Sequence, residues 1–202
     1  SNSRYAIGCA TGTDALILSL RASGIQSGDE VISVPNTFYA TIGAIVAIGA
    51  KPVFVDCDER MQINPDLIEQ AITSKTKGIL PVHWMGCPAE MDKIMAIANK
   101  HNLVVIEDAC PAVGAEINGK RCGSFGKASG FSFHPLKPLN VWGDGGSIAT
   151  NDDDVADYLN LYRNHGMSDR DHIDMWGINS RIQPFQAIIA TRVLDTVDNS
   201  NG

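Results

Sequence analysis

The chain has 202 residues, enough for one sizeable domain with a buried core. Its hydrophobic share of 44% and charged share of 19% are those of an ordinary globular protein. The net charge is −7 and no predicted element carries a basic cluster, which disfavours nucleic acid and anionic membrane surfaces as partners. The longest apolar run, residues 41–50, is too short to span a bilayer.

Short apolar runs alternate along the chain with segments of helical periodicity. In chain order, the sequence predicts a helix at 14–22, a strand at 30–34, a helix at 40–48, a strand at 52–55, a helix at 65–72, a strand at 78–82, a helix at 89–102, strands at 103–107, 130–133 and 146–150, and a helix at 153–163. This alternation predicts an α/β fold, with a mainly parallel sheet covered on both faces. No repeat or linker divides the chain, so one domain is expected over residues 1–202. Because ligands of such sheets bind at the carboxyl ends of the strands, the residues that carry chemistry should follow strands.

Small residues run directly into the first predicted helix. Gly12 would allow a close approach, and Thr11 and Thr13 offer hydroxyl groups beside the free N–H groups of a helix start. Such a segment is suited to binding an anion. An ordinary threonine N-cap is the alternative, and this pattern alone favours it.

The strand at 103–107 is followed by a second acid, Asp108, directly after Glu107. A carboxylate at the end of a central parallel strand costs desolvation energy unless a positive group faces it. One interpretation is an acid held against a cationic ligand group such as a protonated pyridine nitrogen. A helix cap or a structural ion pair is the other, and the sequence leaves both open.

Lys137 follows another strand and lies between apolar residues and prolines. Removing a lysine from water favours the neutral amine that imine formation requires. A surface lysine with its stem on apolar residues is the ordinary alternative. Phe38, which follows the strand at 30–34, offers an aromatic face to a flat ring, although a core phenylalanine is the commoner case.

Three other patterns are set aside. Residues 114–120 have the spacing of a phosphate-binding loop, but Arg121 stands where Ser or Thr should hold magnesium. His83 and Cys87 lack the second pair of a zinc site, so no metal is expected. The five cysteines are scattered and odd in number, which favours free thiols in a reducing cytoplasm.

The order and spacing of the motifs resemble the DegT/StrS family of sugar aminotransferases, a branch of the fold-type I enzymes that depend on pyridoxal 5′-phosphate (PLP). The similarity runs from about residue 5 to residue 195. The matching stretches are residues 10–16, 28–32, 34–38, 49–56, 81–86, 105–109, 123–126, 131–137 and 143–146. The fold that the resemblance implies is the three-layer α/β/α large domain of these enzymes.

The resemblance assigns roles to the candidate residues. It makes Lys137 the catalytic residue that forms the Schiff base and moves the substrate proton, with His134 as a second catalytic candidate beside it. The cofactor-binding residues that it implies are Gly12, Thr13 and Ser132 at the phosphate, Phe38 on the ring face, Asp108 at the pyridine nitrogen, and Asn179 at the phosphate of a neighbouring subunit. The last role implies a homodimer with shared active sites.

The implied reaction moves an amino group from L-glutamate to a keto-sugar. A nucleotide-linked keto-sugar is the family's usual substrate, while residues 134–146 are similar to the subgroup that aminates an eight-carbon keto-sugar acid for lipopolysaccharide. Pro111 stands where the family commonly has Gln. Family members are nearly twice as long, so an N-terminal segment and a small C-terminal domain are expected to be missing.

Two other functions remain open. A PLP-dependent sugar dehydratase would belong to the same family, but such members carry His at the lysine position, so that Lys137 disfavours this alternative. A cofactor-binding protein without turnover is the other, and the short chain and Pro111 favour it.

Overall fold

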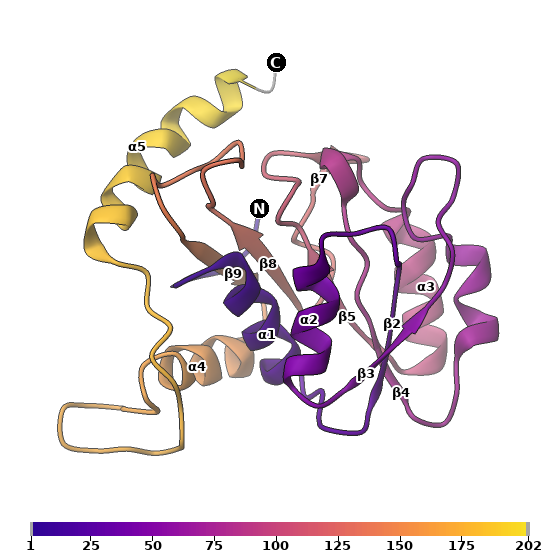
Figure 1. The fold of residues 1–202 in the computed structure, drawn as a ribbon, viewed down its shortest axis with the longest axis horizontal. Coiled ribbons are helices and arrows are strands. Elements are labelled where there is room, and N and C mark those ends of the chain that lie inside the picture. The colour runs from indigo at the N-terminus through magenta and orange to yellow at the C-terminus, as the bar shows by residue number, and fades with distance from the viewer. Residues whose placement is uncertain (1, 201–202) are drawn as a thin grey trace.

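A seven-stranded sheet forms the centre of the computed structural model, which describes residues 2–200 and the side chains through residue 194 (Figure 1). Its strands are β1 (Tyr5–Cys9), β2 (Glu30–Ser33), β3 (Lys51–Phe54), β4 (Thr76–Ile79), β5 (Val104–Asp108), β8 (Ala128–Ser132) and β9 (Gly146–Thr150). The helices are α1 (Gly12–Ala22), α2 (Tyr39–Ala47), α3 (Met91–His101), α4 (Asp153–Tyr162) and α5 (Pro184–Ser200). A small hairpin, β6 (Glu116–Ile117) and β7 (Lys120–Arg121), lies outside the sheet.

The strand order is β1-β9-β8-β5-β4-β2-β3, and neighbouring strands from β3 to β8 pair in parallel. Strand β9 runs antiparallel to both of its neighbours. The α/β fold with a mainly parallel sheet is therefore confirmed. The carboxyl ends of β2, β4, β5 and β8 meet at one edge of the sheet, where the sequence predicts the ligand site.

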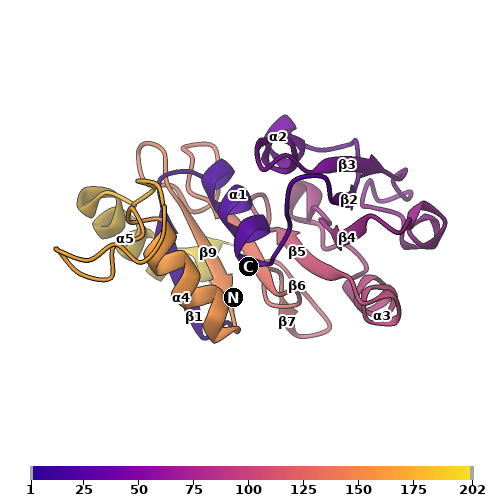
Figure 2. The ribbon, with the colours of Figure 1, turned by 90° about the horizontal axis from the view of Figure 1, so that it is seen from below.

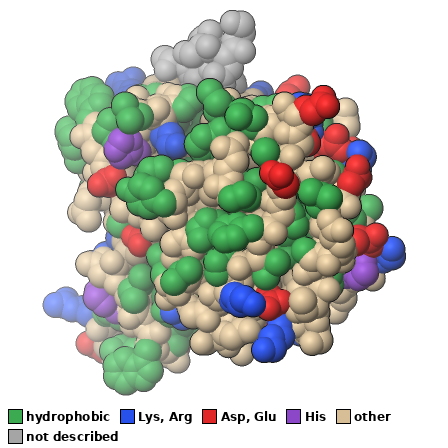
Figure 3. Space-filling model, turned by 45° about the vertical axis from the view of Figure 1, so that its right-hand side comes forward, with side chains coloured by type: hydrophobic (Ala, Val, Ile, Leu, Met, Phe, Trp, Pro, Cys, Tyr) green, Lys and Arg blue, Asp and Glu red, His purple; other side chains and the backbone are tan. Residues whose placement is uncertain are grey.

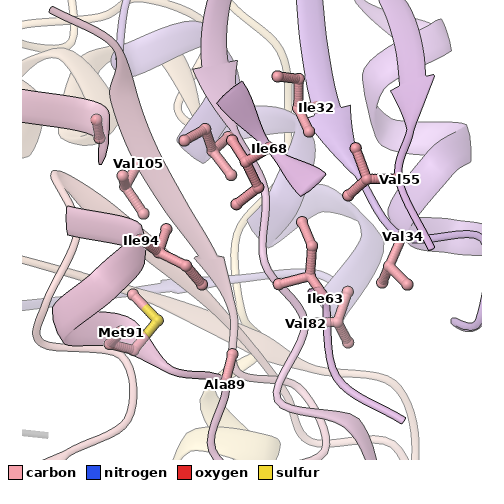
Figure 4. Close-up of a cluster of buried hydrophobic side chains, with 12 residues drawn as sticks. Ile32, Val34, Val55, Ile63, Ile68, Val82, Ala89, Met91, Ile94 and Val105 are labelled. Carbon is pink, nitrogen blue, oxygen red and sulfur yellow. The ribbon is translucent and has the colours of Figure 1, made fainter. Parts of the chain in front are cut away.

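Alternate residues of the inner strands pack into two separate cores, as a pleated strand requires. Val31 and Ile106 face α1 and α2, whereas their neighbours Ile32 and Val105 face α3. Figure 2 shows α1 and α2 on one side of β2, β4 and β5, with α3 on the other. Figure 4 shows the α3 side, where Ile32, Val105 and Ile94 point into one cluster. Helices thus cover both faces and give the expected three layers.

Several elements differ from the sequence prediction. The helix predicted at 65–72 is two short 3₁₀ turns, Pro65–Leu67 and Glu69–Ala71, and the Asn64 side chain caps the first of them. A segment of eight residues is too short to hold an α-helix without strong packing, and its end at Ile72 is already extended. Strand β1 and helix α5 were not predicted. The short β1, which contains Gly8, has no β-branched run to reveal it.

Between residues 2 and 200, no helix combines the length and the apolar character that crossing a membrane would need. The same part of the chain contains no group of three or more His, Cys, Asp and Glu side chains arranged to hold a metal ion. All five cysteines are free thiols.

Candidate active site at the carboxyl edge of the sheet

A cavity of about 600 Å³ opens at the carboxyl edge of the sheet, between the start of α1, the start of α2 and the turn that follows β8. The cavity is partly apolar and open to solvent on one side, with the size of a small-ligand site. Seven of the eight residues selected from the sequence line it, namely Gly12, Thr13, Phe38, Asp108, Ser132, His134 and Lys137. The eighth, Asn179, does not.

The start of α1 forms one end of the cavity. Thr11 is the N-cap, and its hydroxyl accepts a hydrogen bond from the Asp14 N–H at 2.9 Å. The N–H groups of Gly12 and Thr13 have no acceptor within the helix, because they belong to its first turn. A Cβ on Gly12 would lie 2.5 Å from Cβ of Ser132, so only glycine lets the helix start approach the end of β8. The threonine N-cap and the anion site are therefore compatible features of one segment.

Asp108 lies at the floor of the cavity, at the last position of β5, and is 4% exposed. Its Oδ2 accepts a hydrogen bond from the Thr41 hydroxyl at 2.7 Å, and its Oδ1 accepts one from the Cys110 N–H at 3.1 Å. A buried carboxylate held by neutral donors is suited to facing a cation.

Glu107 points to the opposite face of the sheet and is fully buried there. Its Oε2 lies 3.0 Å from Nε2 of His83 and accepts the Gly123 N–H at 2.8 Å. Its Oε1 accepts the N–H groups of Phe125 and Gly126 at 2.7 and 2.8 Å. Burial alone would raise the pKa of Glu107, but these hydrogen bonds lower it overall. Of the paired acids, Glu107 thus has a structural role and is held by hydrogen bonds, whereas Asp108 faces the cavity.

His83 accepts a hydrogen bond at Nδ1 from the Ala89 N–H, at 3.1 Å. Burial alone would lower the pKa of His83, but the Cys122 and Glu107 side chains beside it raise the pKa overall, to about 9. The Ala89 N–H nevertheless points at Nδ1, where a second ring proton would collide with it, so the ring in this arrangement is neutral. His83 therefore donates from Nε2 to Glu107. Both ring nitrogens make hydrogen bonds, so neither is free to bind zinc.

Lys137 follows β8 in a turn that begins at His134, whose carbonyl accepts the Lys137 N–H at 2.8 Å. The Lys137 side chain is half-buried at the cavity rather than removed from water as its apolar sequence neighbours predict. This expectation is wrong because Pro135, Leu136 and Pro138 are themselves exposed in the turn. His134 is also exposed, and its Nδ1 accepts the Leu136 N–H at 3.2 Å.

Phe38 is the N-cap residue of α2 and reaches the cavity with 53% of its surface exposed. Its ring lies 4.1 Å from the ring of Tyr39, centroid to centroid. The structure adds Trp84, Met85 and Asp144 to the lining, none of which the sequence reasoning selected. Thr41 was also missed, although it lies one helical turn after Phe38 and therefore on the same side of α2.

Asn179 is exposed and pairs with Asn164 through a short antiparallel bridge. The segments around Asn164 and Asn179 are thus joined to each other. The next residue, Ser180, is buried and donates to Oδ2 of Asp14 at 2.8 Å. This contact fastens the Asn179 segment to the first turn of α1, and nothing in the sequence pattern indicated it.

The chain is similar to known proteins. The model of the DegT/DnrJ/EryC1/StrS aminotransferase family matches residues 1–202. A UDP-N-acetyl-3-dehydro-α-D-glucosamine 3-aminotransferase of Acidithiobacillus ferrooxidans is 50% identical over 92% of this chain and 50% of its own length. The chain therefore spans about half the length of the curated relatives that it matches.

Two solved structures are similar over 98% of this chain. One is DesV of S. venezuelae in complex with a ketimine intermediate, at 41% identity, a TM-score of 0.93 and 53% coverage of that protein. The other is NtdA of Bacillus subtilis with the bound cofactor PMP, at 37% identity, a TM-score of 0.92 and 45% coverage. At these TM-scores, both proteins share the fold of this chain.

Proposed function

The chain belongs to the DegT/DnrJ/EryC1/StrS aminotransferase family, and from this membership we propose that it forms the cofactor-binding part of a PLP-dependent sugar aminotransferase. The reaction moves an amino group from L-glutamate to a keto-sugar in the synthesis of cell-surface polysaccharide. The observation that carries the proposal is the gathering of Lys137, Asp108 and the Gly12–Ser132 contact around one cavity. Residues 1–202 act as one large domain, and the five free thiols favour a cytoplasmic setting.

The residues of the cavity fit PLP, the cofactor of this family. Its phosphate is an anion, and the close approach at Gly12 leaves the first N–H groups of α1 free for it, beside Ser132. The ring nitrogen is basic, and the buried Asp108 carboxylate, held by the neutral donors Thr41 and Cys110, can face it. The cavity of about 600 Å³ is large enough for the cofactor and part of a sugar.

Each residue then has a defined task in the reaction. The bound cofactor supplies an electron sink for the carbon that carries the amino group. Lys137 would hold the cofactor and move the proton at that carbon, while Asp108 would keep the ring nitrogen protonated. Gly12, Thr13 and Ser132 would bind the phosphate, and Phe38 would cover the ring. His134, the second catalytic candidate, is exposed and lines the same cavity.

A nucleotide-linked keto-sugar is the acceptor that we propose. Its support is the name of the relative from Acidithiobacillus ferrooxidans, which includes a UDP-linked sugar. The test supplies PLP and L-glutamate, measures 2-oxoglutarate, and compares nucleotide-linked 3-keto and 4-keto hexoses with an eight-carbon keto-sugar acid. Amination of a nucleotide-linked sugar is expected. Amination of the eight-carbon acid alone would move the chain to the lipopolysaccharide subgroup, and release of water without amination would favour a dehydratase.

We further propose that two copies of the chain share their active sites. Large apolar side chains reach the surface near the cavity and on the 142–194 side, including Leu136 at 87%, Trp142 at 75% and Trp176 at 92% exposure. Figure 3 shows hydrophobic side chains exposed on one face of the molecule. Asn179, exposed beside this surface, would then reach the phosphate in the partner's cavity.

Mixing two inactive variants tests this arrangement. Lys137→Ala and Asn179→Ala each damage every site of their own homodimers. In a mixed dimer, one of the two sites keeps both residues, because the lysine and the asparagine come from different subunits. A one-to-one mixture is therefore expected to regain about a quarter of the wild-type amino transfer. No recovery, with mixed dimers demonstrated by mass, would contradict shared sites.

A cofactor-binding protein without turnover is the second candidate function. Pro111, where the family commonly has Gln, lines the cavity beside Cys110 and offers no side-chain hydrogen bond there. A chain that binds PLP through Lys137 but forms no 2-oxoglutarate from L-glutamate would favour this candidate.

A further inference from the structure

A chain of hydroxyl groups runs from the cavity wall to Asp108. The Thr37 and Thr41 hydroxyl oxygens lie 2.7 Å apart, and the Thr41 oxygen lies 2.7 Å from Oδ2 of Asp108. Thr41 is 1% exposed and Asp108 is 4% exposed, so water does not compete for these bonds. Both threonines line the cavity.

The direction of the chain follows from the number of hydrogens. Each hydroxyl has one hydrogen to donate, and an ionised carboxylate only accepts. Thr41 must therefore donate to Asp108, which leaves its oxygen free to accept from Thr37. Thr37 is the donor of the first bond. The order is Thr37 to Thr41 to Asp108, with every hydrogen directed toward the carboxylate.

These contacts fix the rotation of the carboxylate. The Cys110 N–H holds Oδ1 and the Thr41 hydroxyl holds Oδ2, from opposite sides of the group. One donor comes from the chain just after β5, and the other comes from α2, 67 residues earlier in the sequence. A carboxylate held at both oxygens has one orientation toward the cavity, whereas a carboxylate held at one oxygen can rotate about its terminal bond.

We propose that Thr41, supported by Thr37, is a positioning residue that orients Asp108 toward the ring nitrogen of the cofactor. The proposal rests on the proposed function of this cavity. In this proposal, Thr41 acts through the Asp108 carboxylate. Hydrogen bonds to a charged group are the stronger kind, so their loss should weaken the contact that the carboxylate makes on its other side.

The test measures equilibrium binding of pyridoxamine 5′-phosphate, which has an amine in place of the aldehyde and does not need Lys137 for binding. Thr41→Val keeps the shape of the side chain and removes both hydrogen bonds, while Thr41→Ser keeps the hydroxyl. We expect Thr41→Val to raise the dissociation constant about tenfold and to change the near-visible circular dichroism of the bound ring. Thr41→Ser should restore both, and Thr37→Val should show a smaller effect in the same direction.

Thr150→Val is the matched control. Thr150 is also a buried threonine whose hydroxyl donates at 2.7 Å, but its acceptor is the Lys127 carbonyl at the opposite edge of the sheet. We expect this variant to lose stability without losing affinity for the cofactor. Equal affinities for Thr41→Val and Thr150→Val would overturn the positioning role, as would a Thr41→Ser variant that fails like Thr41→Val.

The result for Thr41 can be distinguished from the result for the proposed function. Wild-type chain that binds pyridoxamine 5′-phosphate in a Thr41-dependent way, but gives no Lys137-dependent band with PLP, supports the positioning role and contradicts the aminotransferase. A Lys137-dependent band with PLP, together with pyridoxamine 5′-phosphate binding that does not depend on Thr41, supports the aminotransferase and contradicts the positioning role. A folded wild-type chain that does not bind the probe contradicts both.

Discussion

Replacing Lys137 with alanine is expected to abolish the near-visible absorbance band that PLP acquires on binding and to stop the formation of 2-oxoglutarate from L-glutamate. The physical reason is that an alanine offers neither an amine for covalent attachment nor a group to move the substrate proton. Loss of the proton transfer alone is expected to lower the rate by roughly 10²–10⁴-fold. The measurement is absorbance during titration with PLP, followed by addition of L-glutamate.

Two further variants make this result specific. Lys137→Arg keeps a positive charge at the half-buried position but has no amine that forms an imine, so it should behave like the alanine variant. Lys93→Ala removes an exposed lysine on α3 that pairs with Glu90, and should leave band and rate unchanged. A band that persists in Lys137→Ala would mean that another amine attaches the cofactor, and would remove the central residue of the proposed function.

Glu107→Gln is expected to be strongly destabilising, although the two side chains have nearly the same shape. All four hydrogen bonds at Glu107 come from donors, two at each oxygen. A glutamine must turn its NH₂ group toward one of these pairs of donors, whichever way the amide is oriented. We expect the free energy of unfolding to fall by about 3 kcal/mol, measured by urea denaturation at constant m-value.

The pH dependence gives an independent check on Glu107. Its folded-state pKa is lowered, so the stability that it contributes is fully present above the unfolded-state value of about 4.3 and is lost as the pH falls through the folded-state pKa. The wild-type chain should therefore lose stability in acid more steeply than Glu107→Gln, which has no such group.

Glu69→Gln serves as the control for loss of a paired glutamate. Glu69 lies at the surface and bonds to Lys100 and His101, where water replaces the lost contacts. Its stability should change little. If Glu107→Gln is as stable as Glu69→Gln, the groups around Glu107 do not require a carboxylate. That result would also contradict the assignment of His83 as a neutral ring that donates to Glu107.

Several features of the site could be predicted because they depend on local sequence. Thr11 caps α1 and Gly12 lies where a side chain would collide, as the small residues at the start of a helix indicated. The apolar strands end in residues that line the cavity, as parallel strands require. Lys137 lies at the cavity, but its partial exposure was not predicted, since its apolar neighbours in the sequence turn outward in the folded chain.

Other features of the site could not be found in this way. The sequence placed two acids at the end of β5 without showing which of them faces the cavity, and the contacts of Ser180 with Asp14 join residues 166 positions apart. A single sequence records each of these residues but not its neighbours. The packing of α2 and of the 163–181 segment against the start of α1 brings these residues together, and that packing is decided by the tertiary structure.

The sequence by itself determined the alternation of strands and helices, the edge of the sheet at which ligands bind, and the residue types available for chemistry there. These follow from periodicity and turn residues, which act over a few positions along the chain. The tertiary structure decided that Asp108 faces the cavity while Glu107 is held by His83, and that Thr41 reaches Asp108 from 67 residues away. The reason is that neighbouring strand residues point to opposite faces, and only the elements packed on each face determine what a buried carboxylate meets.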